Sequence, residues 1–343
     1  MGQEVIDIHL HFGAPSGPGS GCYWSKEFES GLAFLAMRLV TRSLCRHITL
    51  QSATEHMLEV INGSRFVHKS VVLALDEVYD DQGRPHPEQT HLYVPNGTLA
   101  GLAKDNTRVL FGASVHPFRP DWEDELQKCL AEGCVLCKWI PSSQQIDPSH
   151  PRCLPFYRRL RDEQLPLLCH VGPEGAIPPF DQASQGLNSP RLLRSALEAG
   201  VTVIAAHAAL PLLPPPLESD RYYRELIDLF HEGESKGWNL YADLSAINLG
   251  PRMSYIDRVK VDIPPERLVF GSDYPLPILD ISQRPRLSLW HRLKYFFQTI
   301  AAKNPLDKNY LLIKNMEFDE ALFTTAAKIL RLPEPPRAAP ITR

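Results

Sequence analysis

Eight short apolar segments of strand length recur along the chain, and this repetition constrains the fold more than any other feature. Most are rich in β-branched or aromatic residues, and several are continuous apolar runs, which is typical of parallel strands buried on both faces. Segments with helical periodicity lie between them, and they predict helices over residues 123–131, 154–163, 190–198, 222–232 and 287–302. This alternation predicts an α/β fold, specifically a (β/α)8 barrel. The predicted strands span residues 5–9, 70–75, 109–115, 135–140, 165–170, 201–207, 239–244 and 268–272.

The chain length leaves room for insertions in such a barrel. It has 343 residues, whereas a (β/α)8 barrel typically needs about 250. The segment between the first two predicted strands, residues 13–65, is long, and we expect it to form inserted helices over one mouth of the barrel. We expect a single domain over residues 1–332, followed by a proline-rich tail over residues 333–343.

Composition excludes several classes of protein. The formal net charge is −4 and no basic run is dense, which argues against a nucleic-acid partner. No apolar run reaches the roughly 18 residues that span a bilayer, so we expect no membrane partner. The N-terminal residues include Glu4 and Asp7 and lack the basic region of a secretory signal. With seven cysteines that we expect to be reduced, the sequence predicts a cytoplasmic enzyme of small molecules. A homo-oligomer is compatible with the sequence, which does not determine the oligomeric state.

Two histidines stand two residues apart in the first predicted strand. Side chains at positions i and i+2 of a strand project to the same face, so His9 and His11 would point in one direction. Two imidazoles that converge in this way make half of a metal site. So short a motif is not specific by itself, because an ordinary strand with one hydrogen-bonded histidine explains it equally well.

Further polar residues stand at or just after the ends of later predicted strands, where a (β/α)8 barrel builds its active site. Imidazole and carboxylate ligands together suit zinc, manganese or iron(II). Each residue also has an ordinary explanation: a histidine can be a satisfied core residue or a loop anchor, and an aspartate can cap a helix. The residues concerned are His116, Lys138, His170, His207 and Asp273.

Taken in chain order, these motifs resemble those of the amidohydrolase superfamily, and more closely its amidohydrolase-related branch of metal-dependent hydrolases and decarboxylases. The resemblance runs from the first strand to the last. The matching pieces are Asp7-Ile8-His9-Leu10-His11, Cys169-His170-Val171, Ala205-Ala206-His207 and Phe270-Gly271-Ser272-Asp273-Tyr274-Pro275.

The resemblance implies a role for each of these residues. His9, His11, His170 and Asp273 would hold one divalent ion, with zinc expected first and manganese or iron(II) as alternatives. Asp273 would also be the general base that takes a proton from water activated by the ion. His207 would orient and donate protons, or would bind a second ion.

Lys138 leaves the number of ions open. In some members of the superfamily the lysine at this position is carboxylated and bridges two metals, in which case Lys138 and His207 would serve a second ion. In others one metal suffices and a nearby lysine contacts the substrate. We favour one ion, and two if Lys138 is carboxylated.

The resemblance favours hydrolysis of an amide, ester or lactone bond in a small molecule. The same site would also support non-oxidative decarboxylation or hydration of a carboxylic acid, and a non-catalytic metal-binding barrel is a third interpretation. A carboxylate substrate would require a cation, for which Arg119, Lys138 and Arg252 are candidates. The candidate substrate contacts are His116, Arg119, Trp139 and Glu174.

Overall fold

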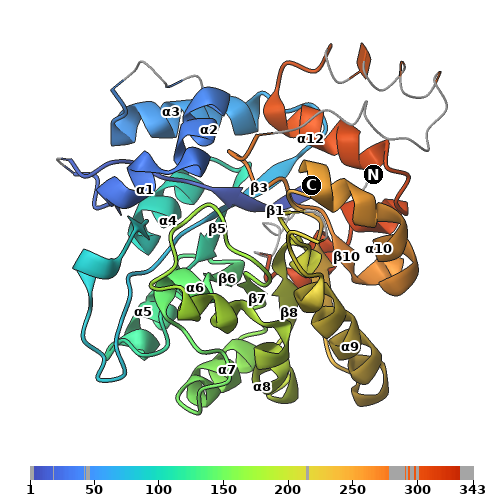
Figure 1. Cartoon of the computed structure of the whole chain (residues 1–343). Helices are drawn as coiled ribbons and strands as arrows, with labels where there is room; N and C mark the ends of the chain where they lie inside the picture. The colour runs from blue at the N-terminus through green and yellow to red at the C-terminus, as the bar shows by residue number, and fades with distance from the viewer. Residues whose placement is uncertain are drawn as a thin grey trace, which may run out of the picture.

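Eight parallel strands form the centre of the protein in the computed structural model (Figure 1). The structure describes residues 4–17, 19–41, 43, 47–213, 216–277, 290, 293, 297–298 and 301–332. The strands follow one another in space in the same order as in the sequence, and every neighbouring pair is parallel. They are β1 (Ile6–His11), β3 (Lys69–Leu73), β5 (Val109–Ala113), β6 (Leu136–Trp139), β7 (Leu167–Cys169), β8 (Val203–Ala205), β9 (Leu240–Asp243) and β10 (Leu268–Val269).

Hydrogen bonds between the last strand region and the first complete the ring. The Ile8 N–H donates to the Phe270 carbonyl at 3.2 Å, and the His11 N–H donates to the Tyr274 carbonyl at 2.8 Å. The Asp273 N–H donates to the His9 carbonyl at 2.7 Å. The predicted (β/α)8 barrel is therefore confirmed, and residues 9 and 273 are neighbours although they lie at opposite ends of the sequence.

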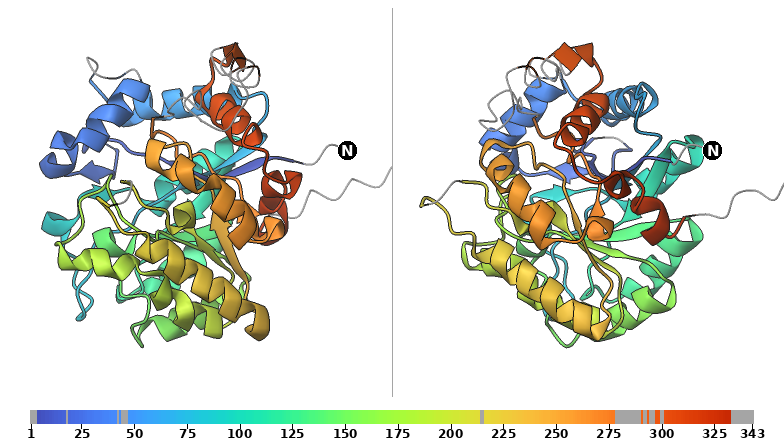
Figure 2. Two further views of the ribbon diagram at one scale, coloured as in Figure 1. Left: turned by 45° about the vertical axis from the view of Figure 1, so that its right-hand side comes forward. Right: turned by 90° about the vertical axis from the view of Figure 1, so that its right-hand side faces the viewer.

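Helices surround the strands on the outside, as the two turned views in Figure 2 show. Helix α9 illustrates how the sequence produces this layer: Tyr223, Leu226 and Phe230 are buried on one face, and the helix ends at Gly237, whose φ of 66° suits a C-terminal cap. The outer helices are α4 (Asn96–Asp105), α5 (Trp122–Ala131), α6 (Pro141–Gln144), α7 (Cys153–Asp162), α8 (Arg194–Glu198), α9 (Arg221–Lys236), α10 (Ile256–Asp262), α12 (Pro305–Lys314) and α13 (Ala326–Ile329).

The segment after β1 contains the expected inserted helices. They are α1 (Lys26–Ser30), α2 (Leu32–Val40) and α3 (Leu50–Asn62), grouped on one side of the barrel in Figure 1. Thr49 and Ser52 form a capping box at the start of α3. A short antiparallel pair that the sequence did not predict, β2 (Tyr23–Trp24) with β4 (Leu92–Tyr93), ties the insertion to the loop after β3.

Four of the five predicted helices are present: α5, α7, α9, and a 3-10 turn over residues 190–193 that continues into α8. The fifth, over residues 287–302, lies largely outside the described residues, as does the tail over residues 333–343. In the described part of the chain, no helix combines the length and apolar character needed to cross a membrane.

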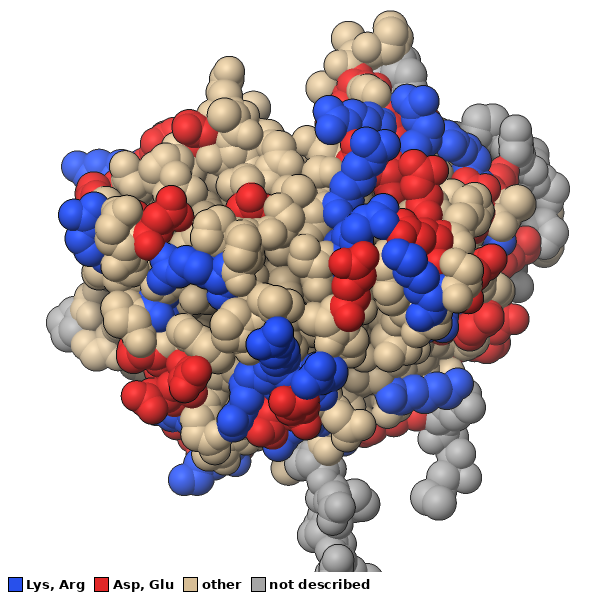
Figure 3. Space-filling model, turned by 90° about the horizontal axis from the view of Figure 1, so that it is seen from below, with Lys and Arg blue, Asp and Glu red and all other residues tan. Residues whose placement is uncertain are grey.

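The face of the protein seen in Figure 3 carries charges of both signs. Ion pairs within α9 join Arg221 with Glu225 at 2.6 Å and Lys236 with Glu232 at 2.7 Å. Among the residues described on this face, basic and acidic side chains are interspersed, so it presents no extended field of one sign.

Candidate metal centre

The two histidines of β1 and the aspartate after β10 converge on one point. His9 Nε2 lies 3.1 Å from His11 Nε2. Asp273 Oδ1 lies 3.6 Å from His9 Nε2 and 3.4 Å from His11 Nε2. Two ligands on one tetrahedral zinc, each about 2.0–2.1 Å from it, stand roughly 3.3 Å apart. These three atoms therefore fit a shared divalent ion.

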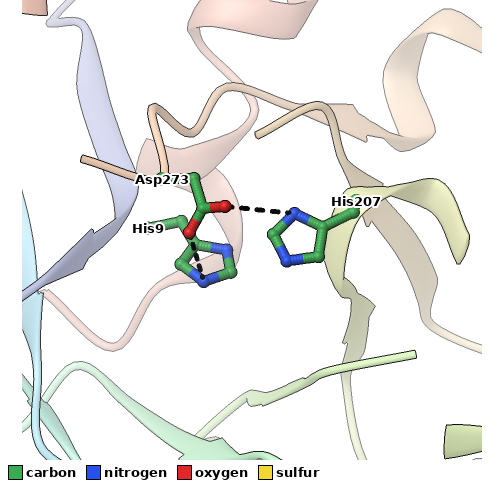
Figure 4. A group of neighbouring side chains, drawn as sticks. All are labelled: His9, His207 and Asp273. Carbon is green, nitrogen blue, oxygen red and sulfur yellow. Dashed lines mark ion pairs between the residues drawn. The ribbon is translucent and has the colours of Figure 1, made fainter. Parts of the chain in front are cut away.

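His207 joins this group from the turn after β8. His9, His207 and Asp273 can each offer a ligand atom such that all of these atoms lie within 4.8 Å of one another (Figure 4). His207 Nδ1 is 3.8 Å from Asp273 Oδ2, and its ring stacks on that of His9 with 5.0 Å between centroids. Both His207 (φ 56°) and Asp273 (φ 59°) have left-handed backbones. Such strain in residues other than glycine concentrates at functional sites.

His170 stands beside this cluster, at the end of β7. Its ring centroid is 5.0 Å from that of His207, and its Nε2 is 3.2 Å from Glu174 Oε2. The contact with Glu174 lacks hydrogen-bond geometry, so Nε2 is a buried nitrogen without a hydrogen-bond partner among the described residues. Burial lowers the pKa of His170 to about 4, which keeps the ring neutral near pH 7. A neutral, unpartnered imidazole nitrogen suits a metal ligand.

A second layer of side chains, which the sequence analysis missed, orients the imidazoles. His9 Nδ1–H donates to Asp243 Oδ2 at 2.8 Å, which leaves the lone pair of Nε2 facing Asp273. Asp243 Oδ1 accepts hydrogen bonds from the backbone N–H of His207 and from the Ser245 hydroxyl. Carboxylates commonly orient metal-bound histidines in this way. Asp243 is the last residue of β9, so the rule used for the other strand ends could have found it.

Neighbouring charges set the ionisation state of Asp273, and close packing at Gly271 sets the position of His9. Burial alone would raise the pKa of Asp273, but His207, His11 and His9 together hold it well below its usual range, so the carboxylate is ionised at neutral pH. A Cβ at Gly271 would lie 2.9 Å from the Cβ of His9. Glycine is therefore required there for His9 to reach its position.

Lys138 lies in the same cluster. Its side chain is fully buried in β6, and its Nζ is 3.2 Å from His9 Nε2. Burial lowers the pKa of its amine, although Asp243 and Asp273 oppose this shift. The amine thus faces the same nitrogen lone pair that an ion would use.

A cavity of about 400 Å³ opens above the cluster. His11, His170, His207 and Asp273 form its floor, and apolar side chains of α1, α2 and α3 cover it. A hydrogen bond of 2.8 Å between His56 Nε2 of α3 and the hydroxyl of Tyr274 ties this cover to the residue after Asp273. The predicted substrate contact Glu174 and the candidate cation Arg252 both line the cavity.

The other three candidate substrate contacts do not line this cavity. His116 Nε2–H donates to the Gln144 carbonyl at 2.9 Å, and the Phe118 N–H donates to His116 Nδ1 at 3.1 Å, so both ring nitrogens are used by the main chain. Arg119 pairs with buried Asp76 at 3.1 Å. Trp139 is fully buried, and its Nε1–H donates to the Val115 carbonyl at 2.9 Å. The structure thus gives each of them a structural role.

Comparison with known proteins agrees with the fold. The chain matches the model of the amidohydrolase family over residues 74–317. It is similar to a TIM-barrel protein from Bordetella bronchiseptica, with 17% identity, a TM-score of 0.53, and 94% of this chain and 99% of that chain covered. It is also similar to an amidohydrolase from Burkholderia multivorans, with 14% identity, a TM-score of 0.54, and coverage of 96% and 100%. No protein of curated function matches the chain.

A (β/α)8 barrel that gathers histidines and aspartate at the carboxyl ends of its strands defines an enzyme of the metal-dependent hydrolase and decarboxylase class. The family match covers well over half of the chain, and the chain belongs to the amidohydrolase family. The match begins at residue 74, so β1 and its two histidines lie outside it. Their convergence on Asp273 is a separate observation that supports the same conclusion.

Proposed function

We propose that this enzyme hydrolyses an amide, ester or lactone bond in a small molecule, using one divalent ion held by His9, His11, His170 and Asp273. The observation that carries the proposal is the 3.1–3.6 Å separation of His9 Nε2, His11 Nε2 and Asp273 Oδ1. Zinc is our first candidate because tetrahedral N/O sites suit it, with manganese and iron(II) as alternatives.

A bound ion would polarise the scissile carbonyl and lower the pKa of water toward about 7. Asp273 is ionised. Its Oδ1 lies near His9 and His11, whereas its Oδ2 lies 3.8 Å from His207 Nδ1, so Oδ2 would be the oxygen that accepts the proton. His207 is buried beside Oδ2 and its pKa is held well below the usual range by burial, so it begins the reaction neutral and can relay a proton to the leaving group. Asp243 keeps the Nε2 of His9 directed at the cluster.

In this proposal the number of ions depends on the chemical state of Lys138. If Lys138 is a free amine that contacts His9, the site holds one ion. If the amine is carboxylated, Lys138 and His207 would serve a second ion. Metal stoichiometry measured together with ¹³C NMR of protein incubated with ¹³C-bicarbonate distinguishes the two states, because only a carboxylated lysine takes up the label.

Decarboxylation of a carboxylic acid is the second candidate function, and one observation favours it. Arg252 places a buried guanidinium in the cavity that holds the cluster. Such a group is suited to binding a substrate carboxylate. A panel of lactones, esters, amides and aromatic acids separates the two reactions, since carbon dioxide release without ester, lactone or amide turnover would favour the decarboxylase.

The test of the metal centre is metal content measured by mass spectrometry on purified wild-type protein and on Asp273→Asn and His11→Ala. We expect both variants to lose the ion and turnover. His116→Gln is the matched control, a buried histidine at another strand end that should retain the metal. Unchanged metal content in Asp273→Asn and His11→Ala would contradict the proposal.

We also propose a cytoplasmic location. The described cysteines are all buried and unpaired, which is typical of proteins in a reducing compartment.

A further inference from the structure

We propose that the substrate is an amphipathic carboxylic acid, with its carboxylate on Arg252 and its apolar body in the chamber beneath the inserted helices. We call this part of the cavity the lid chamber; Phe28, Phe34, Met37 and Met57 wall it. The inference rests on the proposed function, because the lid chamber and the candidate metal centre belong to one cavity.

Arg252 is a buried cation without an ion-pair partner among the described residues. It follows β9 in the 3-10 turn Gly250–Tyr255, lines the cavity and is only 2% exposed. Its Nε has no hydrogen-bond partner, and no carboxylate of the described residues forms an ion pair with it. Guanidinium stays charged in proteins, and a buried charge without a partner is costly. The site is therefore built to receive an anion.

Among the described residues, the carboxylates whose charges act most strongly on Arg252 are those of Asp273 and Glu174. Neither forms an ion pair with Arg252, and other groups hold both in place. Glu174 Oε1 accepts hydrogen bonds from the backbone N–H groups of Ala176 and Ile177 at 2.7 and 2.9 Å, and its Oε2 faces His170. Asp273 is held between His9, His11 and His207. A carboxylate of the substrate matches the planar fork of a guanidinium and would complete the site.

The lid chamber indicates what the rest of the substrate looks like. The ring of Phe34 packs against those of Trp24 and Phe28, with centroids 5.1 and 5.2 Å apart, and these contacts make a firm apolar wall. On the cavity side of α2, Ala33 and Ala36 are small and leave space. The whole cavity, about 400 Å³, falls within the roughly 300–1,000 Å³ of sites for drug-sized ligands. It suits an aryl or alkyl body, far larger than a two-carbon acid.

Three ligands test this assignment by calorimetric titration of the metal-loaded wild-type enzyme. They are 4-phenylbutyrate, the uncharged 4-phenylbutanamide, and acetate, which has the charge without the body. We expect 4-phenylbutyrate to bind at least about 10-fold more tightly than either of the others, because each lacks one of the two interactions. This comparison requires no variant, so misfolding cannot obscure it.

Variants then locate the two interactions. Arg252→Gln should reduce the affinity for 4-phenylbutyrate to that for the amide. Ala36→Trp fills the lid chamber, so it should reduce the affinity for 4-phenylbutyrate toward the affinity for acetate. Leu35→Trp is the matched control, because Leu35 is on the same helix but 54% exposed, and it should bind like wild type. Thermal melts followed by circular dichroism identify any variant that does not fold.

Two results would overturn the assignment. One is equal affinity of the wild-type enzyme for the acid and the amide, or for the acid and acetate. The other is a charge preference that persists in Arg252→Gln, which would place the carboxylate on the ion instead. In both cases metal retention could be intact, so the proposed function would stand; loss of that function is detected separately, by metal content and turnover.

Discussion

Two groups of buried or half-buried polar residues stand at the mouth of the barrel, and they differ in which partners their polar atoms contact. The ligand cluster comprises the proposed metal ligands His9, His11, His170 and Asp273, and the anchor cluster comprises Asp76, His116 and Arg119. In the ligand cluster, two Nε2 atoms and one carboxylate oxygen face one another without main-chain partners. In the anchor cluster, hydrogen bonds and an ion pair occupy the polar atoms.

The difference shows that a polar residue at a strand end is not sufficient to predict a functional residue. His9 and His116 are both fully buried, and both follow apolar strand residues. Main-chain groups use both nitrogens of His116. The nitrogens of His9 instead contact only side chains: Nδ1 contacts Asp243, and Nε2 contacts Lys138 and His11. A site for a ligand requires atoms that the protein leaves available.

The largest expected effect separates the two clusters by activity. Asp273→Asn removes the proposed proton acceptor and one proposed ligand of the ion, so we expect turnover to fall by about 10³-fold or more. Arg119→Gln changes only the anchor cluster and should stay within a few-fold of wild type. Steady-state kinetics with a substrate found in the hydrolase and decarboxylase panel measures both. Similar losses of turnover in the two variants would contradict the assignment of different roles to the ligand cluster and the anchor cluster.

The barrel could be predicted from the sequence because the pattern that encodes it, a short apolar run, is local and is repeated along the chain. Eight apolar runs of strand length can be recognised one at a time, and the fold brings their ends together without further assumptions. This rule singled out His9, His11, His207 and Asp273, and the structure places these side chains next to one another. The lining residues were harder, because whether Trp139 or Glu174 faces the cavity depends on side-chain direction and on loop geometry, which no short pattern encodes. Asp243 was overlooked although it ends β9.

The second prediction concerns the stability of the anchor cluster. Arg119→Met leaves buried Asp76 without its cation, and breaking such a pair costs about 3 kcal/mol. Burial already raises the pKa of Asp76, so removal of the arginine should raise it further. Urea unfolding measures the loss. The double variant Asp76→Asn/Arg119→Met should recover part of it, and no recovery would mean that the arginine acts by packing alone.

The third prediction tests the layer behind the ligand cluster. Asp243→Asn keeps the shape of the side chain but weakens the hold on His9 Nδ1–H, and we expect about a 10–100-fold loss of metal affinity. Competition with a fluorescent zinc chelator measures it. Asp76→Asn is the control, an equally buried aspartate that contacts no histidine side chain of the ligand cluster, and it should leave the affinity unchanged. Equal losses in both would indicate a general effect on folding.

The smallest predicted effect is a pH dependence of stability that arises from His116. Burial lowers its pKa from 6.5 to about 3 in the folded protein, so below pH 6.5 the unfolded chain binds a proton that the native ring does not. Stability therefore falls as the pH drops from about 6.5 toward 3, and the loss from His116 between pH 7 and pH 5 is about 2 kcal/mol.

His116→Gln should be less stable than wild type at pH 7 because the ring's contacts are lost, but it should lose about 2 kcal/mol less on acidification. Urea midpoints at the two pH values measure this difference, which is independent of any metal because His116 contacts no residue of the ligand cluster. If wild type and variant lost the same stability on acidification, the folded protein would have to bind a proton at His116, and Nδ1 could not then accept the Phe118 N–H as it does in the structure.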